Sequence, residues 1–248
     1  MAERVEPAHG DDGGAVAAPQ PRRPRLPFWA SLLLNVVVAI AVVAVVQALW
    51  VKVYSVPSGS MENTLEVGDR MLVNRTAYPD GMADSQDVVV FTANEDWATP
   101  ASSEGAVENA VRTFGDLTGI GRSHEQALVK RVVGTAGQTV ECCTAEGAVT
   151  VDGEPLDEPY IHNDLPFIRD ELDCESEVMS ARCFGPVTVP EDSMLVLGDH
   201  RSNSADSVIA CRGIPADQAG DCARFVTRED IVGEVFVTVW PPTHWGGH

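Results

Sequence analysis

A turn with the sequence "PSGSM", residues 57–61, lies between two valine-rich stretches early in the chain and presents Ser60 as a candidate nucleophile. A serine hydroxyl attacks well only when a neighbouring base removes its proton. Histidine is the usual base, and His200 beside Asp199 has the most suggestive setting. However, Ser60 lacks the G-x-S-x-G surroundings of a nucleophile elbow, so a Ser-His-Asp triad has little support.

Lysine offers the alternative base. Lys130 lies in the sequence "ALVKRVVG", where apolar residues flank it on both sides. Burial disfavours the ammonium form and lowers the pKa of a lysine, by up to about 3–5 units for a fully buried group. A neutral amine with a pKa of about 8 would accept the Ser60 proton. Lys130 would instead face solvent if it lay on the other face of its strand, and the spacing alone leaves both orientations open.

The third polar stretch is "GDHRSNSADS", residues 198–207, which follows an apolar stretch. Its small polar residues are typical of a tight turn held by Asx side chains, and such turns are common. If these residues act together with Ser60 and Lys130, the fold must bring three distant segments to one place.

An apolar stretch of 23 uncharged residues, Phe28–Trp50, precedes all three segments. As a helix it would span a hydrocarbon core of about 30 Å. Three arginines lie just before it, so the positive-inside rule places the N-terminus in the cytoplasm and residues 51–248 outside. Residues 1–27 lack hydrophobic patterning and are predicted to be a disordered tail. The sequence "VQA" at 46–48 allows a cleaved signal peptide, but the stretch exceeds the ~7–15 apolar residues of one, so we expect an uncleaved anchor.

The net negative charge and all the cysteines lie in the part of the chain after this stretch. The first 50 residues carry equal numbers of acidic and basic side chains, so the whole net charge of −20 lies on residues 51–248. Such a surface repels nucleic acid, which binds through Lys and Arg. All six cysteines also lie there without a C-x-x-C pair, which favours disulfides in an oxidising compartment over a metal site.

We expect Cys211 and Cys222 to close one loop, and the other four cysteines to pair among themselves. Cys142 and Cys143 are adjacent in the sequence, and adjacent residues of a strand point to opposite faces. Each of these two should therefore take a different partner.

Short runs of Val, Leu and Ile, separated by Gly, Pro and Asp, dominate residues 51–248. This pattern predicts a mainly β fold of short, mostly antiparallel strands. The sequence Asp152-Gly153 within "VTVDGEPL" is a strong hairpin signal. We interpret residues 92–127 as an inserted segment with one helix at 104–117, and about 141–192 as a cysteine-bearing β module.

At its three polar segments the sequence resembles type I signal peptidases, membrane-anchored Ser/Lys proteases of the S26 type, and most of all the actinobacterial members. The family pattern P-S-x-S-M-x-P-T-L appears here as "PSGSMENTL", residues 57–65. The sequences "DVVVF", "KRVVG" and "GDHRSNSADS" follow in the family's order. The resemblance covers residues 28–91 and 128–245. It implies antiparallel sheets in the β fold that signal peptidases share with SOS-repressor proteases.

The resemblance assigns a role to each residue type in the site. It implies Ser60 as nucleophile, Lys130 as general base, and the Ser58 hydroxyl with the Ser60 N–H as the oxyanion hole. Ser204 would orient the Lys130 amine, while Asp199 and Asp206 would hold the loop, one of them paired with Arg131. The substrate pockets would be lined by apolar or aromatic residues, namely Tyr54, Val56, Met61, Leu65 and Val129. No metal or other cofactor is implied.

Three positions depart from the family pattern. Asn63 replaces a proline, so the turn after the nucleophile loses a fixed φ. His200 replaces a common asparagine. Val208 stands where many members carry an arginine that pairs with the loop aspartate, so Asp206 needs another partner, for which Arg201 and Arg212 are the candidates.

The resemblance implies a membrane-bound serine endopeptidase that cleaves signal peptides from secretory preproteins after small residues. It would be a single-pass protein of the plasma membrane, in contact with the lipid bilayer and the export translocon. One alternative, a self-cleaving repressor protease, is disfavoured by the apolar anchor and the absence of a DNA-binding segment. The other is a catalytically impaired, membrane-tethered β-fold binding protein, which only Asn63 and Val208 favour.

Overall fold

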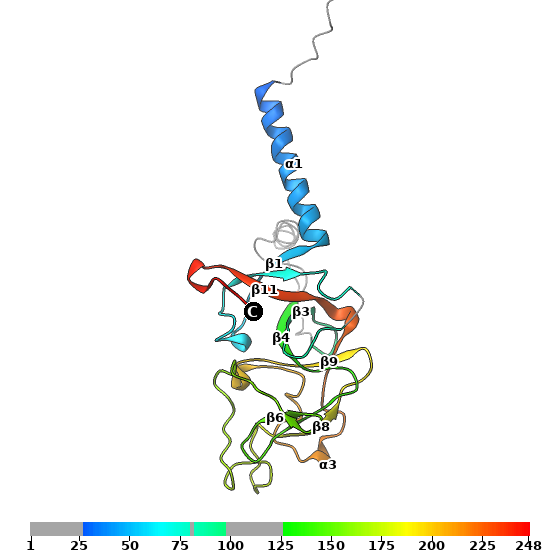
Figure 1. Cartoon of the computed structure of the whole chain (residues 1–248), viewed down its shortest axis with the longest axis vertical. Coiled ribbons are helices and arrows are strands. Elements are labelled where there is room, and N and C mark those ends of the chain that lie inside the picture. Colours follow the sequence, from blue (N-terminus) through cyan, green and yellow to red (C-terminus); the bar gives the residue numbers. More distant parts are fainter. Residues whose placement is uncertain (1–26, 80–81, 98–125) are drawn as a thin grey trace, which may run out of the picture. The chain divides into compact units, whose positions relative to one another are not determined.

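The computed structural model describes residues 27–79, 82–97 and 126–248 (Figure 1). Residues 1–26 of the predicted tail and most of the predicted insertion, including its helix at 104–117, lie outside these residues. The chain divides into two compact units, one ending at Ala39 and the other running from Ile40 to His248.

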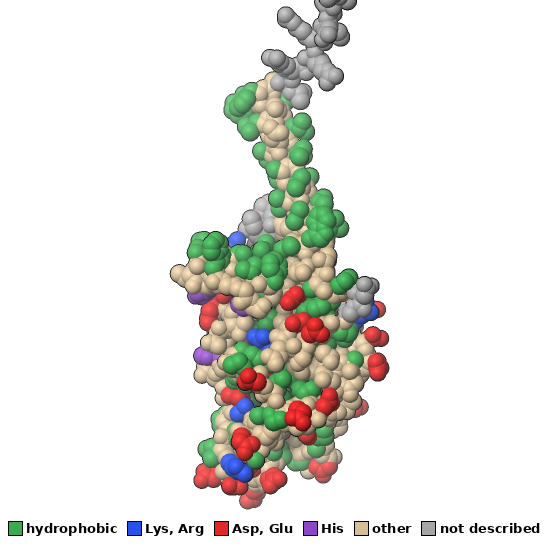
Figure 2. All heavy atoms as spheres, in the orientation of Figure 1, with side chains coloured by type: hydrophobic (Ala, Val, Ile, Leu, Met, Phe, Trp, Pro, Cys, Tyr) green, Lys and Arg blue, Asp and Glu red, His purple; other side chains and the backbone are tan. Residues whose placement is uncertain are grey.

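The boundary between the units falls within helix α1 (Phe28–Leu49), the long apolar helix near the N-terminus. Its residues Phe28–Gln47 have a mean hydropathy of 2.6. Hydrophobic side chains are exposed along this helix (Figure 2), whereas a helix at the surface of a soluble protein is apolar on one face only. A single residue, Trp50, separates α1 from the first strand, β1 (Val51–Ser55).

The larger sheet has eight strands, and every neighbouring pair is antiparallel. Its order is β1, β2 (Arg70–Asn74), β11 (Ile231–Trp240), β3 (Val88–Thr92), β4 (Ala127–Gly134), β9 (Ser193–Leu197) and β10 (Val226–Thr227), with β12 (Gly246–Gly247) on β11. The mainly β, antiparallel prediction is therefore confirmed. β1 lies at one end of the strand order, while β4 has neighbours on both sides.

A smaller sheet has four antiparallel strands in the order β7 (Glu154–Pro155), β6 (Val149–Val151), β5 (Thr139–Cys142) and β8 (Phe184–Thr188). These strands overlap the proposed cysteine-bearing module. β6 and β7 are joined by Asp152 and Gly153, which have φ values of 53° and 82°. Two successive positive φ values belong to a type I′ turn, so the hairpin prediction is confirmed.

The remaining short elements connect these strands. Within the described residues they are the helix α3 (Ala216–Ala219) and four single 3₁₀ turns, η1 (Gly59–Met61), η2 (Arg201–Asn203), η3 (Arg228–Asp230) and η4 (Pro242–His244). Two of the 3₁₀ turns, η1 and η2, contact each other across a long stretch of sequence.

β3 shows how the strand sequences build a core on both faces of the larger sheet. Successive side chains of a strand point to opposite faces. Val88 and Val90 accordingly join one apolar cluster, whereas Val89 and Phe91 join another, and all four are buried. This explains why the sequence "VVVF" is continuously apolar rather than alternating.

The cysteines form three bridges, and the four cysteines other than Cys211 and Cys222 pair among themselves, as expected. Cys211 is paired with Cys222, as predicted, and Cys174 is paired with Cys183. The expectation for the adjacent pair was wrong, because Cys142 is bonded to Cys143. β5 ends at Cys142, so Cys143 lies outside the strand and the alternation of faces does not apply to it.

Replacing both Cys211 and Cys222 with alanine should destabilise the protein. The bridge closes a loop of sequence separation 11, and loops of this size contribute about 3 kcal/mol. Cys211 is also fully buried in an apolar cluster. Thermal unfolding of the full-length protein in detergent should show a melting temperature several degrees below wild type. Equal melting temperatures without reductant would mean that the bridge is absent.

Candidate active site

The turn that carries Ser60 leaves the edge strand β1 and closes as η1. Ser58 is extended immediately before it, and its side chain makes no capping hydrogen bond to the turn. Ser60 itself is only 7% exposed. The hydroxyl is thus held within the structure rather than presented on a free loop.

Lys130 lies at the centre of β4 and points into the protein, where it is 4% exposed. Its Nζ is 2.6 Å from Ser60 Oγ and 3.0 Å from the Val129 carbonyl oxygen. Desolvation lowers the pKa of Lys130 to about 8; the charges of Asp206 and Asp199 oppose this shift, and that of Arg224 adds to it. The sequence left open whether Lys130 faces solvent or the interior, and the structure shows that it faces the interior.

Asp199 joins the turn after Ser60 to the strand that carries Lys130. Its carboxylate accepts two hydrogen bonds from Arg131, of 2.9 Å from Nε and 2.6 Å from Nη2. It also accepts one of 2.5 Å from the Thr64 hydroxyl. Bidentate pairs of this kind fix geometry as well as charge. Of the two aspartates expected as partners of Arg131, Asp199 is the one it binds.

Asp206 is fully buried, and its partner is Arg212 at 3.1 Å. Arg201, the other candidate, donates instead to Glu158 and to the Gly198 carbonyl oxygen. Val208, which replaces an arginine, is buried in an apolar cluster. Asp206 therefore keeps a cationic partner, Arg212, which lies four residues after Val208 in the chain.

Gly198 begins the loop after β9 and lies where this loop passes the nucleophile turn, that is, the turn η1 that carries Ser60. A Cβ placed there would be 2.2 Å from Ser204 Oγ and 2.6 Å from the Ser60 carbonyl oxygen. The His200 N–H donates to that same carbonyl over 3.0 Å. Only glycine fits at 198 while Ser60 and Ser204 remain this close.

Ser204 is buried, but its hydroxyl has no hydrogen-bond partner among the described residues. The role implied by the resemblance required a hydrogen bond to Lys130, and the described contacts of the Lys130 amine are to Ser60 and Val129. Ser204 is thus positioned beside the site without the expected contact.

The proposed pocket residues share one environment. All five belong to a single apolar cluster and are at most 7% exposed, with Val129 adjacent to Lys130 and Met61 adjacent to Ser60; the others are Tyr54, Val56 and Leu65. The cluster therefore contains the immediate sequence neighbours of both Ser60 and Lys130.

A buried serine hydroxyl in contact with a buried lysine amine is the nucleophile–base pair that a Ser/Lys protease requires. Residues 29–240 match the family model described as signal peptidase, peptidase S26. The chain belongs to the signal peptidase family.

Individual members of the signal peptidase family are similar over most of the chain. The probable signal peptidase I of Mycobacterium leprae (strain TN) is 33% identical over 246 residues, covering 94% of this chain and 83% of that protein. Signal peptidase I of Mycobacterium tuberculosis (strain H37Rv) is 33% identical over 247 residues, with 95% and 80% covered. The probable signal peptidase I-2 of Synechocystis sp. is 28% identical, with 86% and 74% covered.

The histidine alternative for the base can be checked against the contacts of Ser60 in this member of the signal peptidase family. His200 Nδ1 lies 2.6 Å from Glu62 Oε2, and no histidine among the described residues is hydrogen-bonded to Ser60 Oγ. The Ser-His-Asp alternative therefore has no geometric support.

Two residues that contribute to the site were missed in the sequence. Thr64 occupies the threonine position of the family pattern, so a signal for it was present. Tyr160 stacks under the Arg131 guanidinium, 3.9 Å from ring centroid to Cζ, and no motif surrounds it. Burial raises the pKa of the Tyr160 phenol well above its usual value.

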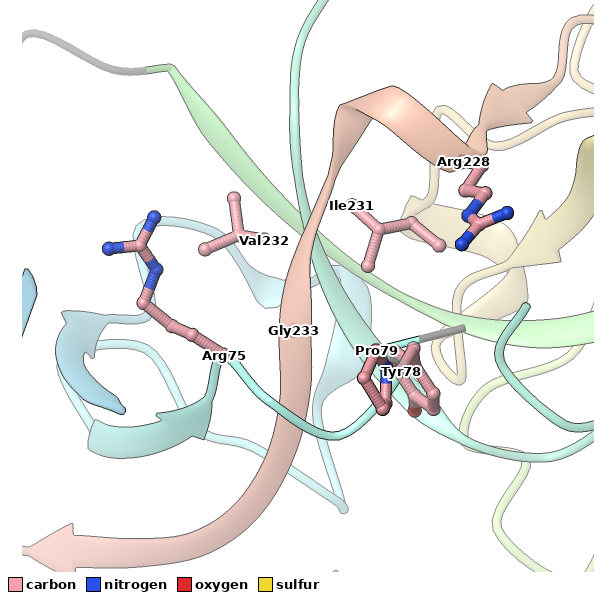
Figure 3. A pocket seen from close by; sticks show the side chains of 7 residues that line it. All are labelled: Arg75, Tyr78, Pro79, Arg228, Ile231, Val232 and Gly233. Carbon is pink, nitrogen blue, oxygen red and sulfur yellow. The ribbon is translucent and has the colours of Figure 1, made fainter. Parts of the chain in front are cut away.

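A separate cavity of about 180 Å³ lies beside β11 (Figure 3). It is lined by Arg75, Tyr78, Pro79, Arg228, Ile231, Val232 and Gly233. None of the proposed catalytic or pocket residues contributes to it, so it is distinct from the site at Ser60.

Gly198→Ala should remove most activity while the protein remains folded. The added Cβ must displace Ser204 Oγ or the Ser60 carbonyl, and small misplacements of a nucleophile cost about 100-fold in rate. Preprotein cleavage measures the effect. Gly246→Ala is the matched control, because nothing lies within 4 Å of a Cβ at that position. Full activity of Gly198→Ala would show that the close approach is not required.

Lys130→Met should stabilise the protein at neutral pH. The pKa of Lys130 is about 8 when folded and its ordinary value is 10.5, so the unfolded chain binds more protons in this interval. The cost of burying the charge, up to about 3 kcal/mol, is therefore present below pH 8 and disappears as pH rises towards 10.5.

Urea unfolding of both proteins at pH 7 and pH 10 tests this expectation. The advantage of Lys130→Met should be largest at pH 7 and shrink at pH 10. A Ser202→Ala control, which alters an exposed side chain of the same loop, should retain the wild-type pH dependence. An advantage independent of pH would contradict the proposed protonation change.

Proposed function

We propose that this protein is a membrane-bound serine endopeptidase that removes signal peptides from secretory preproteins, with Ser60 as nucleophile and Lys130 as general base. The observation that carries the proposal is the buried contact of 2.6 Å between Ser60 Oγ and Lys130 Nζ in a member of the signal peptidase family. The relatives named signal peptidase I support the substrate class.

The chemistry proceeds through two acyl transfers. Lys130 takes the Ser60 proton as the oxygen attacks the carbonyl carbon on the N-terminal side of the scissile bond. The ammonium so formed returns the proton to the leaving amine, which releases the mature protein and leaves an ester on Ser60. Lys130 then deprotonates a water molecule, which hydrolyses the ester and frees the signal peptide.

The negative charge that develops on the attacked carbonyl oxygen needs donors nearby. The Ser60 N–H and the Ser58 hydroxyl are the proposed pair, and the Ser58 hydroxyl is not engaged in capping η1. One such donor contributes about 2.7–4 kcal/mol to the transition state. Asp199, Asp206 and Arg131 act as positioning residues, because they hold the segments rather than the reacting atoms.

The substrate is proposed to lie extended along the open edge of β1, where main-chain hydrogen bonds are available. Small side chains at the first and third positions before the cut would fit against the apolar cluster that contains Met61 and Val129. No cofactor has a step in this scheme.

The helix α1 is the proposed membrane anchor, and it divides the chain into three segments. We assign residues 1–27 to a cytoplasmic tail, 28–50 to the membrane span and 51–248 to the catalytic region outside the plasma membrane. The arginines before the helix support this orientation. The lipid bilayer and the export translocon are the proposed partners. Nothing observed supports the alternative of an impaired binding protein.

Substitution of the two reacting groups tests the proposal. Ser60→Ala should reduce cleavage of a purified preprotein to background, and Lys130→Ala should reduce it by at least about 100-fold. Ser202→Ala, an exposed serine in the neighbouring loop, is the matched control and should retain full activity. Wild-type activity in Lys130→Ala would require a different base.

The pH profile tests the assignment of the base independently. Only the neutral amine accepts a proton, and the pKa of Lys130 is lowered to about 8. The rate constant kcat/KM should therefore rise with pH and level off above about 8. A rising limb centred near the ordinary histidine pKa of about 6.5 would instead implicate an imidazole.

A further inference from the structure

Three side chains with metal-binding chemistry meet beside the nucleophile turn. Glu62 follows η1, His200 precedes η2, and His162 lies in the segment between β7 and β8. Their candidate ligand atoms all lie within 4.8 Å of one another. None of the three has a role in the proposed peptide-bond cleavage.

The backbone holds the two histidines together. His162 and His200 form an isolated parallel β-bridge, and the His162 N–H donates to the Asp199 carbonyl oxygen over 2.8 Å. Their rings meet edge to face with centroids 5.1 Å apart. Both imidazoles are therefore presented by fixed segments, which lowers the cost of ordering them around a ligand.

The carboxylate of Glu62 is held over the nucleophile turn. A Cβ on Gly59 would lie 2.5 Å from Glu62 Oε1, so the carboxylate lies directly against the turn at Gly59. Glu62 Oε2 reaches His200 Nδ1 at 2.6 Å. The side chains of Glu62 and His200 are 31% and 11% exposed, so the cluster is partly desolvated yet reachable from solvent.

An ordinary ion pair between His200 and Glu62 would not explain why His162 lies beside them. His162 adds a second imidazole, and its Nε2 contacts only the amide of exposed Asn163, at 3.0 Å, among the hydrogen bonds described for its ring. That amide can rotate into solvent and leave the nitrogen for a stronger ligand. Two imidazole nitrogens and one carboxylate oxygen are a donor set that zinc takes in proteins, with a fourth position left for water.

The present spacing is close to what zinc requires. Ligand atoms at about 2.0–2.1 Å from a tetrahedral ion are about 3.3 Å apart. Glu62 Oε2 and His200 Nδ1 are now 2.6 Å apart, and no two of the ligand atoms are more than 4.8 Å apart. Side-chain rotations that move these atoms by about 1 Å would bring the distances to the required value. The strong negative charge of the chain also favours cations over anions at its surface.

We propose that Glu62, His162 and His200 form a binding site for a divalent transition-metal ion of the zinc type. A bound ion would join the nucleophile turn to the segments that carry the two histidines. It would do so next to Asn63, whose φ of 79° is unusual for a residue other than glycine. The site is independent of the chemistry at Ser60.

Direct binding measurements on the full-length protein, in detergent and without a histidine tag, test the proposal. After removal of metals with a chelator, calorimetry with ZnCl₂ should show that wild type binds zinc with saturation near one ion per chain. Glu62→Gln, His162→Ala and His200→Asn should each weaken zinc binding at least about tenfold. Zinc at about 100 times its Kd should raise the melting temperature by several degrees.

His244→Ala is the matched control, since His244 also pairs with a carboxylate, Asp69, at 2.9 Å, but no third ligand is described there. It should bind zinc as wild type does. Ser60→Ala should also bind normally, so a failure of the proposed peptidase activity would leave this result intact. Glu62→Gln keeps the shape of the side chain, so weaker zinc binding by this variant could not be attributed to misfolding, as it could for His162→Ala. No saturable binding by wild type, or equal affinity in all three ligand variants, would overturn the proposal.

Discussion

The desolvated amine of Lys130 is the constraint on which the rest of the site depends. A buried ammonium is stabilised by any unpaired carboxylate nearby, and two buried carboxylates, Asp199 and Asp206, act on it. Each of these is paired with an arginine, Asp199 with Arg131 and Asp206 with Arg212. The arginines thus offset the charges that would otherwise hold Lys130 protonated, while the same pairs fix the loop in place.

The antiparallel sheet explains how three segments far apart in sequence become one site. β4 lies between β3 and β9, and Lys130 itself is paired with Val89 of β3, so strand pairing fixes the direction of its side chain. The loop after β9 then reaches the turn after β1, where Gly198 allows the backbones to approach closely. The precision of the Ser60–Lys130 contact follows from strand pairing rather than from the loops alone.

Much of this arrangement was predictable, because strand formation and burial leave strong local signals. The valine-rich runs became strands, Asp152-Gly153 became a hairpin turn, and apolar flanks indicated that Lys130 could be buried. Pairings between side chains far apart in the sequence were harder to predict. Arg201 and Arg212 are equally plausible partners of Asp206 by spacing, and only the packing of Glu158 against Arg201 decides between them.

The direct passage from α1 to β1 sets an upper limit on how far Ser60, the proposed nucleophile, can be from α1, the proposed anchor. Eleven peptide units separate Leu49 from Ser60, and a fully extended chain covers at most about 3.3–3.6 Å per residue. Ser60 therefore lies within about 40 Å of the end of the helix, whatever the orientation of the catalytic region. A peptide bond held further than this from the membrane surface is out of range, however accessible it is. The short tether thus restricts cleavage by distance, in addition to any preference for particular side chains.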